Sequence, residues 1–431
     1  MKKQKSLIAL LVCLALCLIS MIGTWCGITD GGNVKVYDLS IDTNKGDVVR
    51  FLEYRPKTAS AENPVPAIIY SPGNDSTAES VRLTSVELAR RGYDVFVLDL
   101  LSAGHSSIGV GNSTTFGFQE LIDYVYDNLD YIDNAHIGIA GYSKGGGNVV
   151  RVMNDYGTQQ REAPDHYVRK VDAALIMAPP FSPLGDVAKG INLGFAAGKY
   201  DPYSRIGFAP VEGYWPGDLS VKREMKETIN FGVPGTFSEA DLDNPDVKVE
   251  IGHTYGSFSE NNARVVYNPA DSTHGSGMIS RGFIFATVDF FMKAIPAPNP
   301  IDANNLTYPF RHAVFRFGAG RLAGNDCACN VAATGYAAFC SAASPGKAAG
   351  FGLEYKERLD HFCDGVPGCW FCAAHYGTRY HSADQQNILS DRARHHRQHF
   401  CIWCCQQRSS LDDVQRIVPA GYVLPVLQCH P

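Results

Sequence analysis

Gly141-Tyr142-Ser143-Lys144-Gly145 is the stretch of this chain that decides the fold. A strand-like apolar run over 136–140 precedes it, and a run compatible with a helix follows over 146–150. A G-x-S-x-G sequence between strand and helix makes a sharp turn that strains the serine backbone, and the flanking glycines relieve the crowding. The hydroxyl then stands clear of the sheet edge, beside the N–H groups of the helix N-terminus. The pattern predicts Ser143 as a nucleophile, and the alternative is a tight turn without chemistry.

A serine hydroxyl needs a base to remove its proton and an acid to orient that base. An apolar run over 191–197 indicates a buried strand, and Asp201 follows in the turn after it. A second run, 263–267, leads into the loop that holds His274. Residues just past the carboxyl ends of strands lie on the rim that carries active sites in open α/β sheets. The chain order Ser143, Asp201, His274 therefore predicts a catalytic triad.

Other residues compete for these roles. Asp201 precedes a proline and could simply begin a turn. Asp172 opens a strand, which places it at the wrong end of the sheet for the acid. His253 lies before the last strand and His274 after it, which favours His274 as the base. Two further histidines fit a loop or a strand edge: His105 and His136.

The rest of the sheet is predicted around this stretch. Further strands are expected at 34–41, 48–54, 67–70 and 93–99, and helices at 80–91 and 116–130. The first two strands should form a hairpin at an exposed edge, because the first of them alternates in polarity. Strands alternating with helices at this spacing imply right-handed βαβ units. The expected fold class is α/β, with a mostly parallel central sheet and helices on both faces.

An oxyanion hole is expected after the 67–70 strand. The backbone N–H of Gly73 or Asn74 should complete it together with the N–H of Lys144. The alternative is that Pro72-Gly73 makes a plain β-turn.

The chain resembles the α/β-hydrolase superfamily over residues 34–295. The resemblance rests on the G-x-S-x-G stretch, on 88–93 leading to the loop 99–106, on 198–201, and on Asn268-Pro269 ahead of Thr273-His274. It implies Ser143 as nucleophile, Asp201 as acid and His274 as base. The family commonly has His-Gly where this chain has Pro72-Gly73, so any role of a histidine there is lost.

The resemblance implies hydrolysis of an acyl bond in a small-molecule or lipid-like substrate, with no cofactor and no metal. A carboxylic ester is favoured, and peptidase or thioesterase activity is the other possibility. The chain is more narrowly similar to a bacterial membrane-associated branch, in which a short N-terminal anchor precedes the domain and further membrane helices follow. The competing class is a catalytically silent membrane or surface binding protein that retains the fold.

The N-terminus independently suggests a membrane. Lys2, Lys3 and Lys5 precede an apolar run of 16 residues over 7–22, which reaches 19 residues if extended through Trp25. Such a segment over 1–26 is either a cleaved signal peptide or a short anchor helix. The lysines should stay in the cytoplasm, which places the hydrolase domain outside, at the cell membrane or secreted after cleavage.

Composition narrows the function classes. The net charge of −6 and the lack of a basic cluster in the hydrolase region argue against nucleic acid as a partner. Residues 27–326 contain no cysteine, so this region has no disulfide framework and no thiolate metal site. Residues 202–252 form a long insertion between acid and base. The insertion is expected to be either a lid over the acyl pocket or a surface excursion that packs its own aromatic residues.

The last stretch, 311–431, differs in composition: it holds ten cysteines, eight histidines and ten arginines but two lysines. A zinc module is one interpretation, a disulfide-rich tail a second, and a disordered or non-native tail a third. Translation in a wrong reading frame is the favoured form of the third, because the resemblance leads one to expect membrane helices here. Candidate zinc ligands are Cys369, Cys372, Cys401, Cys404, His395, His396 and His399.

Overall fold

The computed structural model of the chain describes residues 21–74, 76–109, 113–179 and 187–307, together with residues 11, 15, 18, 19 and 185. The predicted zinc, disulfide or frame-shifted tail over 311–431 lies outside the described residues, as do most residues of the predicted N-terminal hydrophobic helix. Residues 21–29 are helical. Within the described part of the chain, no helix is long and apolar enough to cross a membrane. The N-terminal anchor therefore stays a prediction.

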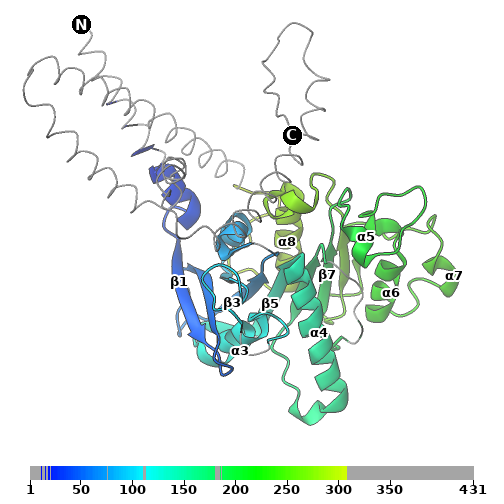
Figure 1. The fold of residues 1–431 in the computed structure, drawn as a ribbon, viewed down its shortest axis with the longest axis horizontal. Coiled ribbons are helices and arrows are strands. Elements are labelled where there is room, and N and C mark those ends of the chain that lie inside the picture. The colour runs from blue at the N-terminus through cyan, green and yellow to red at the C-terminus, as the bar shows by residue number, and fades with distance from the viewer. Residues whose placement is uncertain are drawn as a thin grey trace, which may run out of the picture. The chain divides into compact units, whose positions relative to one another are not determined.

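A sheet of nine strands organises the described residues, in the order β1-β2-β4-β3-β5-β6-β7-β9-β8 (Figure 1). Neighbours from β4 to β9 pair in parallel, whereas β1, β2 and β8 pair antiparallel. The predicted mostly parallel sheet with a hairpin at its edge is confirmed. The strands are β1 (Val34–Asp42), β2 (Val48–Pro56), β3 (Val65–Ser71), β4 (Asp94–Leu98), β5 (Ile132–Tyr142), β6 (Ala173–Met177), β7 (Asn192–Ala196), β8 (Thr254–Tyr255) and β9 (Arg264–Tyr267).

Helices cover both faces of this sheet. The helices α3 (Phe118–Asn128) and α4 (Lys144–Glu162) bury their apolar residues against one face, and α2 (Arg82–Ala89) and α8 (Arg281–Ala294) against the other. Central strands buried on both sides have no polar face, which explains their continuous apolar runs. The shorter elements are η1 (Ala78–Val81), η2 (Pro164–His166), α5 (Ser204–Gly207), η3 (Leu219–Val221), α6 (Arg223–Gly232), α7 (Glu239–Leu242) and η4 (His274–Ile279).

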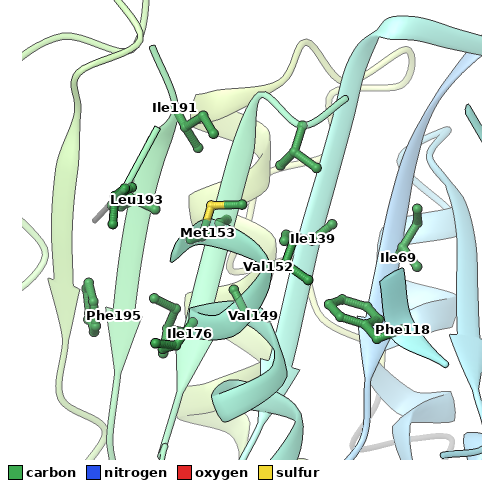
Figure 2. Packing of buried hydrophobic residues seen from close by; sticks show 14 of the residues in the cluster. Ile69, Phe118, Ile139, Val149, Val152, Met153, Ile176, Ile191, Leu193 and Phe195 are labelled. Carbon is green, nitrogen blue, oxygen red and sulfur yellow. The ribbon is translucent and has the colours of Figure 1, made fainter. Parts of the chain in front are cut away.

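The core under α4 holds the nucleophile turn in place. Val149 and Val152 of α4 lie toward Ile139 of β5 and Ile176 of β6 (Figure 2). Burying an aliphatic side chain of this size stabilises the fold by about 1.5–3 kcal/mol. On the opposite face a side chain at Gly138 would meet the ring of Phe291, so glycine lets α8 pack closely. The strand and helix on either side of the turn are therefore both fixed by packing.

The insertion over 202–252 has an internal structure of its own. It contains α5, η3, α6 and α7. The buried ammonium of Lys226 donates hydrogen bonds to the carbonyl oxygens of Asp241, Leu242 and Asn244, at 2.7, 3.2 and 2.7 Å. Burial lowers the pKa of Lys226. These contacts tie α6 to the segment around α7, and the role of the insertion as a lid stays a prediction.

Candidate active site

Ser143 alone makes the turn between strand and helix, because β5 ends at Tyr142 and α4 begins at Lys144. Its backbone has φ 56° and ψ −116°. A residue with a side chain pays about 1–3 kcal/mol for such a conformation, and such residues cluster at functional sites. The strain expected from the G-x-S-x-G sequence is present at the serine itself.

Glycines surround Ser143 because the backbone there is crowded. A side chain on Gly141 would run into the carbonyl group of Gly145. A side chain on Gly145 would run into the carbonyl oxygens of Ser71 and Pro72. The first turn of α4 therefore packs directly against the end of β3, which no larger residue would permit.

The structure brings the three predicted triad residues together. His274 begins η4, in the loop after β9, and Asp201 lies in the turn after β7. The Nε2 atom of His274 is 2.8 Å from Ser143 Oγ, and its Nδ1 atom is 2.7 Å from Asp201 Oδ2. A carboxylate beside Nδ1 keeps the proton on that nitrogen, so Nε2 accepts the hydrogen bond from the serine hydroxyl. This is the arrangement in which imidazole can act as a base toward Ser143.

Asp201 is held in one orientation. Its side chain is 1% exposed, and its second oxygen, Oδ1, accepts the backbone N–H of Tyr203 at 2.8 Å. The N–H of Asp201 donates to the carbonyl oxygen of Gly198 at 2.9 Å. Both carboxylate oxygens are thus engaged, and only one of them faces the imidazole.

Two tyrosines that sequence reasoning missed contact His274. The hydroxyl of Tyr142 donates to the His274 carbonyl oxygen at 2.6 Å. Burial raises the pKa of Tyr142, with a further contribution from the charge of Asp201, so its phenol stays protonated and able to donate. The ring of Tyr203 lies 4.7 Å from the imidazole, centroid to centroid. Their positions, next to the nucleophile and two residues after the acid, are the only signals in the sequence that could have pointed to them.

Residues 68–209 match the family model described as alpha/beta hydrolase fold. The match includes Ser143 and Asp201 and ends before His274. Over these residues the chain is similar to the α/β-hydrolase fold. This agrees with the sheet order and with the helices on both of its faces.

Solved structures similar to this chain have low identity and low TM-scores. An esterase of Pyrococcus furiosus, Pf2001, is 13% identical, with 62% of this chain and 95% of that chain covered and a TM-score of 0.38. The esterase Est22 is 12% identical, with 70% and 86% covered and a TM-score of 0.38. A thioesterase domain from the curacin biosynthetic pathway is 16% identical, with 35% and 46% covered and a TM-score of 0.27. This chain spans less than half the length of that thioesterase domain and of the DcsB structure. No curated protein sequence matches it.

Two of the predicted oxyanion residues, Gly73 and Lys144, lie beside the serine. A Cβ atom on Gly73 would lie 3.5 Å from Ser143 Cβ, so the loop after β3 passes next to the hydroxyl-bearing carbon. Lys144 is the first residue of α4, so its backbone N–H belongs to the helix N-terminus directly after Ser143. Asn148 ties the two elements together, because its buried amide donates to Ser71 Oγ at 3.1 Å.

The competing residues have contacts elsewhere. Asp172 forms an ion pair with Arg169 at 2.9 Å, just before β6 begins. His253 lies 3.7 Å from Glu250 and is 47% exposed. The remaining histidines face carboxylates of their own segments: His105 faces Asp99 and His136 faces Asp133. Among the described residues no group of three or more histidines, cysteines and acids is placed to hold a metal ion.

Proposed function

We propose that this protein is a serine hydrolase that cleaves an acyl bond through Ser143, His274 and Asp201. The observation that carries the proposal is the chain of two hydrogen bonds that links Asp201 to His274 and His274 to a strained Ser143. A strained, glycine-enclosed serine with its hydroxyl on a histidine has no evident role in packing. A carboxylic ester is the favoured substrate because the fold most often serves esters, which is an argument from analogy.

The geometry supports the following steps. Ser143 Oγ attacks the acyl carbon while His274 Nε2 takes the hydroxyl proton, and Asp201 stabilises the imidazolium that forms. The tetrahedral oxyanion accepts hydrogen bonds from the backbone N–H of Lys144 and from that of Gly73 or Asn74. The bond to the leaving group then breaks, and His274 returns its proton to the departing oxygen. Water attacks the acyl-enzyme with His274 as base, the acid is released, and Ser143 recovers its proton.

Two further parts of the proposal concern where in the cell the domain lies and which branch of the superfamily it belongs to. The apolar run over 7–25 behind three lysines leads us to place the domain outside the cytoplasm, attached to a membrane or secreted after cleavage. Fractionation of expressing cells with external protease tests this, and full-length protein in the cytosol would rule out both versions. The proposal that the chain belongs to a bacterial membrane-associated branch draws on the same N-terminal residues.

A fluorophosphonate probe tests the chemistry, because only an activated serine reacts with it quickly. The full-length protein should be labelled at Ser143 and should cleave p-nitrophenyl esters, with acyl chain length varied to define the pocket. Ser143→Ala should lose labelling and about 10³-fold or more of the turnover. Ser259→Ala is the matched control, because that serine is exposed on the loop before β9.

The outcomes separate the two function classes. Circular dichroism should show that Ser143→Ala stays folded, because it removes one hydroxyl without touching the core. A wild-type protein that reacts with no probe is the silent binding protein of the alternative. Near-normal turnover in Ser143→Ala would show that another residue is the nucleophile.

A further inference from the structure

The imidazole of His274 has an aromatic ring against it in addition to its two hydrogen-bonding partners. The Tyr203 ring lies 4.7 Å away, with 39° between the planes. The Tyr142 ring is farther, at 5.5 Å, and is buried on the sheet side. Tyr203 is 52% exposed, so its ring lies beside His274 at the surface. A large aromatic side chain that is half exposed gains little from burial, and its packing on His274 needs another reason.

Charge supplies that reason. The face of an aromatic ring carries negative charge and attracts a cation whose centre lies within about 6 Å. In the proposed reaction His274 changes from neutral imidazole to imidazolium as the tetrahedral intermediate forms. The ring therefore attracts His274 more strongly in the transition state than in the resting enzyme, and only such a difference accelerates a chemical step.

The backbone of the same residue contacts the acid. The Tyr203 N–H donates to Asp201 Oδ1 at 2.8 Å, which leaves Oδ2 for the imidazole. Tyr203 stands at the start of the insertion and immediately precedes α5. One residue at the base of the insertion thus orients the carboxylate through its backbone and covers the imidazole with its side chain.

We propose that Tyr203 is a positioning residue whose ring stabilises the protonated form of His274. The inference rests on the proposed function for its effect on rate, but the ring contact itself exists in the resting protein. It also gives the insertion a defined link to the chemistry, because a movement of α5 would shift the ring on His274.

The other groups around the imidazole belong to other residues, so the wild type and the variants at position 203 share them. They are Asp201 from the turn after β7, Ser143 from the nucleophile turn and Tyr142 from β5. Lys144 of α4 holds its ammonium over the ring of Phe116, 3.7 Å from the centroid. Asp271, in the same loop as His274, accepts hydrogen bonds from Ser280 and Gly282. A comparison of variants at position 203 therefore isolates the ring.

The test compares Tyr203→Leu with Tyr203→Phe in the full-length protein. The leucine variant keeps the backbone N–H and loses the ring face, whereas the phenylalanine variant keeps both. Tyr200→Leu is the matched control, because Tyr200 is a half-exposed aromatic in the same turn that packs on Trp215, 5.2 Å away. Two readouts are needed: the acid limb of kcat/KM against pH, and the titration midpoint of the His274 ring nitrogens by NMR, assigned with His274→Asn.

Removing the ring disfavours imidazolium. The midpoint of the acid limb of kcat/KM and the NMR titration midpoint of His274 should therefore both move to lower pH. The expected shift in Tyr203→Leu is about 0.4–0.7 pH unit, with kcat/KM at its plateau lower by about two- to fivefold. Tyr203→Phe and Tyr200→Leu should match the wild type. An unchanged midpoint in Tyr203→Leu, or an equal shift in Tyr203→Phe, would overturn the inference. If the wild type cleaves no ester, the proposed function fails, and the NMR titration still decides the ring contact.

Discussion

Asp201, at 1% exposure, and Asp94, at 0%, are two of the almost completely buried aspartates among the described residues. They occupy opposite ends of parallel strands. Asp201 lies past the carboxyl end of β7, whereas Asp94 is the first residue of β4. The first is the acid of the candidate triad, and the second lies among residues that sequence analysis never singled out.

Their partners differ in what they can do with a proton. Asp201 faces an imidazole that reaches a serine hydroxyl and is 21% exposed. Asp94 lies beside the buried carboxyl of Glu53, with Arg55 Nε 3.9 Å from its Oδ2 atom. Arg55 is already engaged with Glu53, to which its Nη2 donates at 2.8 Å. Burial, together with the negative charge of Glu53, raises the pKa of Asp94 well above its usual range.

The comparison shows that burial and a perturbed acid do not by themselves make an active site. Guanidinium keeps its proton at all relevant pH values, so Arg55 cannot act on Asp94 as His274 acts on Asp201, as a base that links the acid to a serine hydroxyl. The Asp201 region contains an imidazole placed to accept a proton, a serine hydroxyl and access to solvent. We expect changes at Asp201 to act on chemistry and changes at Asp94 to act on stability.

The largest expected effect is the loss of activity in Asp201→Asn. An amide in place of the carboxylate favours the wrong imidazole tautomer, because its NH₂ group donates where Nδ1–H should be accepted. We expect kcat/KM for ester cleavage to fall by about 10³-fold or more, with little change in the melting temperature. Fluorophosphonate labelling rates give the same comparison without a chosen substrate.

Asp94→Asn is the matched control for that prediction, because it makes the same chemical change at an equally buried aspartate. It should keep ester turnover within about twofold of the wild type, since no residue of its cluster touches the triad. Equal losses of activity in the two variants would mean that the contrast between the two regions is wrong.

Most of the sheet and the candidate triad could be predicted from the sequence. Strands buried on both faces produce apolar runs such as 67–70 and 191–197. Such runs can be recognised even when the predicted ends of the strand are wrong by a residue or two. Asp201 and His274 could be chosen because parallel strands place their carboxyl ends on one edge. These signals are local, and the fold brings them together in a known chain order.

Contacts between side chains of distant segments could not be predicted in this way. Glu53 and Asp94 lie on strands that are neighbours in the sheet but far apart in sequence, and nothing in either run marks the other. The Tyr203 ring over His274 depends on how the insertion folds back after the acid. The strand β8, with two residues, is too short to leave a pattern.

The next largest effect concerns Asp94 and the dependence of the free energy of unfolding on pH. The native state keeps the proton of Asp94 at pH values where the unfolded chain, with an ordinary pKa of 3.8, has lost it. Its contribution to stability is therefore complete below about pH 4 and is lost as the pH rises toward the raised pKa of the folded state. Asp94→Asn stays neutral at every pH. We expect its free energy of unfolding to exceed that of the wild type by about 1 kcal/mol or more at pH 8.

Denaturant titrations of both proteins at pH 4 and pH 8 measure this difference. The gap between variant and wild type should widen with pH, because the wild type loses the contribution of Asp94 as the pH rises and the asparagine variant does not. A gap that is constant, or that narrows toward pH 8, would show that Asp94 is already ionised in the folded protein.

The smallest effect separates two tyrosine hydroxyls, one in each region. Tyr142 donates to the His274 carbonyl oxygen at 2.6 Å, and Tyr131 donates to Glu53 Oε1 at 3.2 Å. Replacing either tyrosine by phenylalanine keeps the ring and removes the hydroxyl, which at Tyr131 also accepts a hydrogen bond from Arg55 Nη2. Each change should lower the free energy of unfolding by about 1 kcal/mol or more. Tyr142→Phe also frees the backbone that carries the candidate base, so its kcat should fall by about fivefold at an unchanged KM. Tyr131→Phe should leave kcat unchanged. If both variants lose similar stability but only Tyr142→Phe loses turnover, the Tyr142 hydroxyl holds His274 in place for the reaction. If both variants lose stability and turnover alike, the Tyr142 hydrogen bond only stabilises the fold.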